Sequence, residues 1–304
     1  MKKILVIGAS GFVGKALAWQ LLADGYGVRC LARKPAKVED LVTTGCEVVQ
    51  GDISAPESIQ QALQSVDAVY ISIHTLAPQH SNTAGQNFMD VEMNGLQNII
   101  TACHSQGVRR IVYVTFLGAA PDAPSAWVRG RWRAEQLLLN SGLDVTVIRP
   151  GMIIGIGGQG FNMALSNAKK RLAILMGNGR QKYRCIAIDD LTYYLAGVLD
   201  HKQTYGRCYD VGSDDVLSNN QLIDVIAGVI GRKHPAKLHI PLSPLKVIAP
   251  LIERVIKMPK GAMKGILDCI PIDSVGDPMP IRSVLSRPLM TARQAIELAL
   301  AQSK

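Results

Sequence analysis

The sequence predicts an α/β fold in which a doubly wound parallel sheet carries helices on both faces. Residues 1–150 alternate short apolar segments of strand length with longer segments that carry apolar residues at helical spacing. The short segments are almost continuously apolar, which is typical of strands buried on both faces. Right-handed helical crossovers join such strands in parallel, so the order of the segments indicates this fold class.

Turn and cap residues mark where these elements begin and end. Gly25, Gly107 and Gly142 each follow a helical pattern, at the place where a glycine commonly ends a helix. A capping-box pattern that begins at Ser54 starts another helix. The expected strands are 4–7, 28–32, 46–50, 68–73, 110–115 and 144–148, and the expected helices include 12–23, 88–105 and 125–140.

The pattern changes after Pro150, so we expect two parts: a sheet domain of residues 1–150 and a small C-terminal substrate lobe of residues 151–304, woven onto the sheet. Residues 151–182 are rich in glycine, asparagine and basic residues, and they look like excursions from a sheet. Strand-like segments follow at 185–188 and 208–211, and helices are expected at 189–199, before Gly231 and at 292–302. Eight prolines between residues 239 and 288 predict short or interrupted elements there.

The composition excludes several classes of protein. Apolar residues make up 48% of the chain and charged residues 19%, which excludes a disordered chain. The six cysteines form no C-x-x-C pair, and no other set of metal ligands is evident, so no metal is expected. We find no signal peptide and no apolar stretch long enough to span a membrane, so the expected location is cytoplasmic.

A glycine-rich turn after the first strand predicts a dinucleotide site. In the sequence Gly8-Ala-Ser-Gly-Phe-Val-Gly14, the first glycine permits a tight turn and the last lets the helix pack closely on the sheet. Gly11 lets the backbone approach a pyrophosphate, which the N–H groups at the start of the helix then bind. This indicates a Rossmann-type NAD(P)-binding domain. The predicted phosphate-binding residues are Gly8, Ser10, Gly11, Phe12, Val13 and Gly14.

The ends of the second and third strands predict which coenzyme is bound. An acidic residue after the second strand would bind the ribose 2′-hydroxyl of NAD, but Arg33 and Lys34 stand there. Arg33 can pair with a 2′-phosphate, so NADP is favoured over NAD; the alternative is a solvated surface charge. After the third strand, Asp52 is expected to accept a hydrogen bond from the adenine amine while Ile53 packs on the ring. A turn cap is the alternative role of Asp52.

The glycine pattern, the Gly-Asp-Ile after the third strand and the Arg-Pro-Gly after the sixth together resemble the short-chain dehydrogenase/reductase superfamily. The resemblance is closest to its atypical branch, similar to NmrA-like proteins and to the accessory subunit of respiratory complex I that has this fold. It covers almost the whole chain and is loose beyond about residue 235. The resemblance implies that Pro150 and Gly151 also line the coenzyme site.

In this superfamily a tyrosine, with a lysine four residues later, passes the proton during hydride transfer. Here Trp127 stands at the tyrosine position and Arg131 at the lysine position, with Glu135 four residues further on. An indole N–H has no proton that titrates in the useful range, and an arginine is effectively never a base. The usual proton relay is therefore missing. Arg131 is expected to hold the ribose or nicotinamide, or else to form a surface ion pair with Glu135.

The residues expected to line the substrate pocket are His74, Thr115 and Trp127. Thr115 takes the place of the serine or threonine of the superfamily. His74 follows the fourth strand, at the edge of the sheet where ligands bind in such folds, and is either a proton donor or a polar loop residue. Tyr113 is expected to face the protein interior. No catalytic residue is assigned.

Two basic stretches leave the question of partners open. The net charge is +9, but the charges are scattered and aromatic residues make up 5%, so no specific nucleic acid is expected. Residues 145–188 hold seven basic residues and no acidic one, which indicates a solvated face or a positive field for an anionic ligand or a membrane. Residues 242–257 form an amphipathic basic segment, either a core or lid helix or a surface that docks on a membrane or a partner.

Two functions are compatible with these sequence features. The first is an NADPH-dependent reductase that transfers hydride to a small carbonyl or quinone-like acceptor, with residues 151–160 shaping the pocket. The second is a non-enzymatic module of NmrA-like type that binds NADP as a sensing, regulatory or assembly ligand. Because the tyrosine that passes the proton is missing, the sequence supports the non-enzymatic module almost as well as it supports the reductase.

Overall fold

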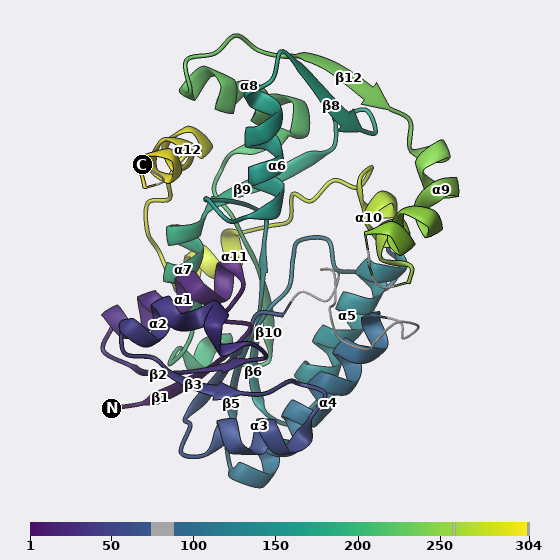
Figure 1. Ribbon diagram of the computed structural model, residues 1–304. Helices are drawn as coiled ribbons and strands as arrows, with labels where there is room; N and C mark the ends of the chain where they lie inside the picture. Colours follow the sequence, from purple (N-terminus) through teal and green to yellow (C-terminus); the bar gives the residue numbers. More distant parts are fainter. Residues whose placement is uncertain (74–87, 257, 259, 303–304) are drawn as a thin grey trace. The chain divides into compact units, whose positions relative to one another are not determined.

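The computed structural model describes residues 1–73, 88–256, 258 and 260–302 (Figure 1). The chain forms two compact units that alternate along the sequence. Unit 1 consists of Met1–Thr115, Gly130–Ile148 and Thr192–Tyr209, and unit 2 consists of Phe116–Arg129, Arg149–Leu191 and Asp210–Lys304. The boundary expected at residue 150 stays a prediction.

The predicted α/β fold class is confirmed by a seven-stranded central sheet. The order of the strands is β10-β6-β5-β4-β1-β2-β3, and the pairs from β6 to β3 are all parallel. The strands are β1 Lys3–Ile7, β2 Gly27–Ala32, β3 Glu47–Gln50, β4 Ala68–Ile71, β5 Arg110–Val114, β6 Asp144–Pro150 and β10 Arg207–Val211. The strand order reverses at β1, since β2 follows on one side and β4 on the other.

One strand of this sheet comes from a segment that the sequence assigned to the C-terminal lobe. Strand β10 adds to the sheet beside β6, and the amide of Gly206 just before it donates to the carbonyl of Val145 at 2.7 Å. Local pattern shows only that residues 208–211 are strand-like. Which sheet they join depends on pairing with a segment about 60 residues away, which periodicity does not report.

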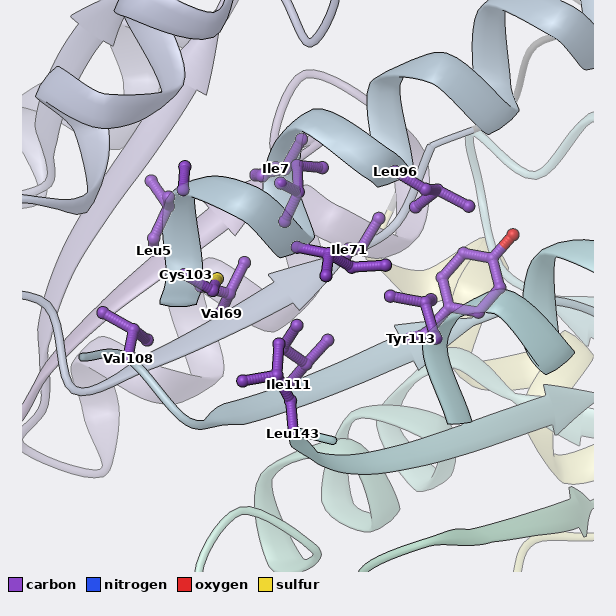
Figure 2. Packing of buried hydrophobic residues seen from close by; sticks show 14 of the residues in the cluster. Leu5, Ile7, Val69, Ile71, Leu96, Cys103, Val108, Ile111, Tyr113 and Leu143 are labelled. Atoms are coloured by element: carbon purple, nitrogen blue, oxygen red, sulfur yellow. The ribbon is translucent and has the colours of Figure 1, made fainter. Parts of the chain in front are cut away.

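Helices pack on the sheet through apolar stripes. Leu96 and Cys103 of α4 belong to one buried cluster with Leu5, Val69 and Ile111 of three neighbouring strands (Figure 2). Each such side chain contributes about 1.5–3 kcal/mol by leaving water. The helices that lie wholly or partly in unit 1 are α1 Phe12–Ala23, η1 Pro35–Val38, α2 Glu39–Thr43, α3 Pro56–Leu63, α4 Phe88–Gln106, α5 Ala126–Leu139, α7 Ile188–Gly197 and η2 Lys202–Thr204.

Unit 2 is built from two small sheets and several helices. A three-stranded sheet has the order β11-β9-β7, and β12 pairs with β8 in parallel. Helices α6, α8 and α12 bury a separate apolar cluster that includes Phe161, Ile223 and Ile296. The elements are β7 Met152–Ile154, α6 Gln159–Ala168, β8 Leu172–Met176, β9 Lys182–Ala187, β11 Val216–Ser218, α8 Asn219–Val229, β12 Ala236–Ile240, α9 Leu242–Val255, α10 Ala262–Cys269, α11 Met279–Val284 and α12 Ala292–Ala301.

The glycine-rich residues 151–182 are more regular than expected, because they contain β7, α6 and β8. The proline-rich part holds short helices, and Pro250 lies inside α9. No helix in the described part of the chain is both long and apolar enough to cross a bilayer. The expected cytoplasmic location stays a prediction.

Candidate coenzyme site

The glycine-rich turn lies where β1 ends, at the point where the strand order reverses. The Ser72 amide, just after the neighbouring β4, donates to the carbonyl of Ile7 at 2.9 Å. Gly8 has φ +95°, and a Cβ atom there would overlap the carbonyl oxygen of Ser72. A ligand in an open α/β sheet binds outside the carboxyl ends of the strands at such a reversal.

The last glycine of the turn lets α1 begin directly against it. A Cβ atom at Gly14 would overlap the carbonyl oxygen of Gly8, and the Gly11 amide donates to that same oxygen at 2.9 Å. Helix α1 starts after Gly11, with no side-chain cap among the described residues and no acidic residue in its first turn. The partial positive charge of a helix N-terminus therefore faces this turn, which suits a phosphate.

The ends of β2 and β3 bring Arg33 and Asp52 together. Arg33 Nε lies 3.8 Å from Asp52 Oδ2, and both side chains contact solvent. The other oxygen of Asp52 accepts hydrogen bonds from the Ser54 amide at 2.9 Å and the Ser54 hydroxyl at 2.7 Å. The turn-capping role of Asp52 is therefore present in the structure, and its contact with adenine stays a prediction.

Lys34 and Ile53 flank this pair. Lys34 is exposed and precedes the short helix η1. Ile53 is half-buried and packs against α4, where a Cβ atom at Gly95 would overlap it. The predicted coenzyme contacts of Lys34 and Ile53 are not tested by these positions.

Arg131 lies in a buried polar cluster rather than at the surface. Its Nη1 atom pairs with Glu92 Oε1, and its Nη2 atom donates to the carbonyl of Val114 at 3.1 Å. Both charged side chains are almost entirely buried. The expected surface position of Arg131 is therefore wrong, since its side chain and that of Glu135 are both buried. Its contact with ribose or nicotinamide stays a prediction.

Tyr113 completes this cluster. Its hydroxyl donates to Glu92 Oε1 at 2.7 Å, and the Arg131 guanidinium lies 5.2 Å from the centre of its ring. The expectation that Tyr113 faces the interior is confirmed, since its side chain is fully buried. Burial raises the pKa of Tyr113 well above its usual value, so it is not an acid at neutral pH.

The cluster keeps its charge because the carboxylate offsets the cost of burial. Burial by itself would lower the pKa of Arg131, but the charge of Glu92 and its hydrogen bond outweigh this and raise the pKa. A buried ion pair with further hydrogen bonds holds side chains in one arrangement, and removing one member leaves a buried charge uncompensated. Glu92, the Val114 carbonyl and the Tyr113 ring thus all contact Arg131 within the protein.

Sequence reasoning missed Glu92, although a signal was present. Glu92 falls on the buried stripe of α4, between Met89 and Leu96 at helical spacing. An acidic residue on the apolar stripe of a helix needs a partner, because an isolated buried charge is costly. The identity of that partner is not visible in the sequence.

The predicted substrate residues fall in different parts of the chain. Thr115 is in unit 1 and donates a 3.0 Å hydrogen bond to Glu135, which is fully buried. Trp127 is in unit 2, where its ring stacks on Phe116 with 4.6 Å between the centroids. His74 lies outside the described residues. A pocket formed by His74, Thr115 and Trp127 stays a prediction.

Pro150 and Gly151 join β6 to β7. The Pro150 carbonyl accepts the Leu117 amide at 3.0 Å, and the Gly151 amide donates to the Val211 carbonyl at 3.0 Å. A Cβ atom at Gly151 would overlap the carbonyl oxygen of Arg184, so close backbone packing requires a glycine here. This is a structural reason for the glycine, and the coenzyme role of both residues stays a prediction.

A surface groove of about 700 Å³ between α4 and α5 lies apart from these residues. Thr101 and His104 of α4 and Arg133 and Gln136 of α5 are among its lining side chains, and none of the predicted coenzyme or pocket residues lines it. In the described part of the chain, no group of three or more His, Cys, Asp or Glu side chains could hold a metal ion.

Comparisons with known proteins identify the glycine turn with a coenzyme family. The family model described as NAD(P)H-binding matches residues 8–173. An NAD(P)H azoreductase from Xenophilus azovorans is 26% identical over 265 residues, which cover 86% of this chain and 81% of the relative. The photosystem II assembly factor Ycf39 from Trieres chinensis is 27% identical over 250 residues, covering 82% of this chain and 75% of the relative.

Solved structures show the same fold at lower identity. The NADPH-dependent quinone oxidoreductase QOR2 from Escherichia coli aligns with a TM-score of 0.75 at 18% identity, covering 98% of this chain and 99% of its own. This likeness extends over unit 1 and unit 2, and at this identity it bears on the fold alone.

Proposed function

The chain belongs to the NAD(P)H-binding family, which confirms its resemblance to atypical short-chain dehydrogenases/reductases, and from this premise we propose an NADPH-dependent reductase of a quinone-like acceptor. The observation that carries the proposal is the turn from Gly8 to Gly14, in which backbone packing leaves no room for a side chain at either glycine. A relative that matches most of this chain is an NAD(P)H azoreductase.

The residues present fit a dinucleotide. The turn offers backbone amides and an uncapped helix start to the pyrophosphate, and Gly11 leaves room for the phosphate oxygens to approach. NADPH, when bound, supplies a hydride to the acceptor. The protein's contribution is to hold the coenzyme at the reversal of strand order, beside the ends of β1 and β4.

The preference for NADPH rests on Arg33. Its ion pair with Asp52 spans 3.8 Å between partly exposed side chains, so it contributes only about 0–1 kcal/mol. A 2′-phosphate carries more charge than one carboxylate and offers the guanidinium a bidentate contact. The phosphate therefore competes successfully for Arg33, whereas the 2′-hydroxyl of NADH does not.

The absence of the usual tyrosine and lysine pair affects which hydride acceptors the protein could reduce. A simple ketone that receives a hydride becomes a strongly basic alkoxide, which needs an acid beside it. A quinone that receives a hydride becomes a phenolate, which is stable in water and takes its proton from solvent. Because Trp127 replaces the usual tyrosine and Tyr113 is buried with a raised pKa, a quinone-like acceptor fits these residues better than a ketone does.

Consumption of NADPH by the purified protein tests the proposal. We expect turnover with a soluble quinone, and at least about a hundredfold slower turnover with a simple aldehyde or ketone, which lacks the stabilised anion. The Gly14→Ala variant is the matched control, since it should lose turnover together with NADPH binding. Equal rates with quinone and ketone would contradict the argument from the missing acid.

A non-enzymatic module that binds NADPH is the second candidate. The observation in its favour is Trp127, which stands where relatives carry their proton donor. A relative of comparable similarity is a photosystem II assembly factor. Tight NADPH binding without turnover of any quinone, azo dye or carbonyl would favour this candidate over the reductase.

A further inference from the structure

Helix α9 in unit 2 has a buried inner face and an exposed apolar outer face. On its inner face, Ala249 is buried, and the buried Glu253 accepts the Gly261 amide at 3.0 Å and the Met263 amide at 2.8 Å. This ties α9 to the start of α10, beside which it lies in Figure 1. A helix buries one apolar face against one neighbouring element. For α9, helix α10 already covers the inner face.

The outer face of α9 carries an apolar stripe. Val247, Leu251 and Val255 follow one another at every turn and are 80%, 64% and 72% exposed. Ile248 and Ile256 beside them are also exposed. Eight of the fourteen large apolar side chains that are exposed in the described residues lie between residues 172 and 256, so this exposure is concentrated rather than scattered.

The other exposed apolar residues of this region lie on the small sheet that precedes α9 in the chain. In the parallel pair of β8 and β12, Ile174 stands opposite Leu238, and both are exposed, as is Leu172 one alternation earlier. Ala173 and Leu175 point to the other face of β8 and are buried. One face of this two-stranded sheet is therefore apolar and open to solvent.

Both surfaces carry more basic than acidic residues, although Lys237 of β12 pairs with Asp224 and Lys246 of α9 pairs with Asp268. Lys169, Lys170 and Arg171 are exposed before β8, and Arg254 and Lys260 are exposed at the end of α9. Residues 159–176 and 232–256 contain one acidic residue, Glu253, which is buried and caps α10. The field over these surfaces is thus positive, which attracts an anionic partner.

We propose that the outer faces of α9 and of the β8–β12 pair, here called the basic apolar surface, dock the protein onto an anionic lipid surface. Aliphatic side chains beside lysine and arginine are the composition of a helix that lies in a membrane interface. A second copy of this chain would bring like charges together, which opposes self-association. Residues 169–176 and 232–256 contain no Phe, Trp or Tyr, whereas Trp and Tyr dominate the binding energy of protein interfaces.

Sedimentation of the full chain with lipid vesicles tests the proposal. We expect binding to vesicles of phosphatidylcholine with phosphatidylglycerol, weaker binding as salt rises, and little binding to phosphatidylcholine alone. Leu251→Asp should lower partitioning at least about tenfold, because it places a charge of the wrong sign in the apolar stripe. Met279→Asp on α11 is the matched control, since Met279 is 62% exposed and outside this surface.

Several results would overturn the proposal. Equal binding of the two variants, or equal binding to neutral and anionic vesicles, would show that the basic apolar surface does not meet the lipid. A lower melting temperature of Leu251→Asp than of Met279→Asp would show that the chain itself covers the stripe. A dimer in sedimentation velocity that Leu251→Asp dissociates would assign the surface to a second copy. NADPH affinity should be equal in both variants, so this test is independent of the proposed reductase activity.

Discussion

Helix α1 of unit 1 and two helices of unit 2, α8 and α12, begin in different ways. In unit 2, α8 and α12 each start with a capping box, Ser218 with Gln221 and Thr291 with Gln294, in which the side chains satisfy the first backbone amides. In unit 1, α1 begins at Gly11 with no such cap among the described residues. Where a side chain of the protein accepts hydrogen bonds from the first backbone amides of a helix, it stabilises the fold. Where these amides are left for a ligand, the fold lacks this stabilisation until the ligand binds.

Each unit also contains a buried carboxylate that is paired within the protein. The Glu92 carboxylate in unit 1 is shared by Arg131 and Tyr113, and the Glu253 carboxylate in unit 2 caps α10. Both acids hold their own unit together, and neither lies on an open turn. Polar groups that are paired within the protein support the fold, so substitutions there and substitutions at the glycine turn should have separable effects.

The largest loss of stability is expected for Glu92→Gln. The neutral amide removes the carboxylate that pairs with the buried Arg131 guanidinium, so the free energy of unfolding should fall by about 3–5 kcal/mol. Urea denaturation measures this. The double variant Glu92→Leu with Arg131→Met should be less destabilised than Glu92→Gln, because it removes both charges. A loss below about 1 kcal/mol in the single variant would mean that water reaches the pair.

Gly14→Ala should weaken coenzyme binding more than it destabilises the fold. The new methyl group overlaps the Gly8 carbonyl, so the turn must shift, and NADPH affinity should fall about a hundredfold or more. Stability should fall by about 1–3 kcal/mol because of the overlap. Fluorescence titration and thermal melts measure the two effects. The control is Gly228→Ala in α8, where a Cβ atom meets nothing within 4 Å; this variant should bind NADPH normally.

Arg33→Ala should change which coenzyme binds without changing the fold. Loss of the contact to the 2′-phosphate should weaken NADPH about 10- to 100-fold and leave NADH nearly unchanged. Calorimetric titration with both coenzymes measures the ratio. The exposed Lys37→Ala variant serves as a control for general loss of positive charge. If Arg33→Ala weakens NADPH and NADH equally, Arg33 does not read the phosphate.

The smallest effect is expected for Thr291→Ala at the start of α12. The lost cap should reduce the free energy of unfolding by about 1 kcal/mol, because the Gln294 amide loses its acceptor. NADPH affinity should not change. Thermal melts with and without NADPH check both points. Weaker NADPH binding in this variant would break the distinction between helix starts that serve the fold and those that serve a ligand.

The sequence predicted unit 1 well because its signals are local. Strand length, continuous apolar segments and the glycine turn are each read within a dozen residues, and the structure has the six expected strands within a few residues of their predicted ends. The sequence predicts a tight turn at Gly8 and close packing of the helix at Gly14, and the φ of +95° at Gly8 and the overlap at Gly14 agree with these reasons. The regular elements of residues 151–182 were missed, since glycine-rich strands and helices lack a clear period.

The amino-acid order alone therefore determined the class of fold, the place of the glycine-rich turn and the presence of Trp127 where the resemblance leads us to expect a tyrosine, because each of these depends on neighbouring residues. Tertiary structure decided that Arg131 is buried and pairs with Glu92, and that β10 joins the central sheet. The partners in both cases are about 40 to 60 residues apart in the chain. Contacts over such separations are selected by how the whole core packs, and no local spacing reports them.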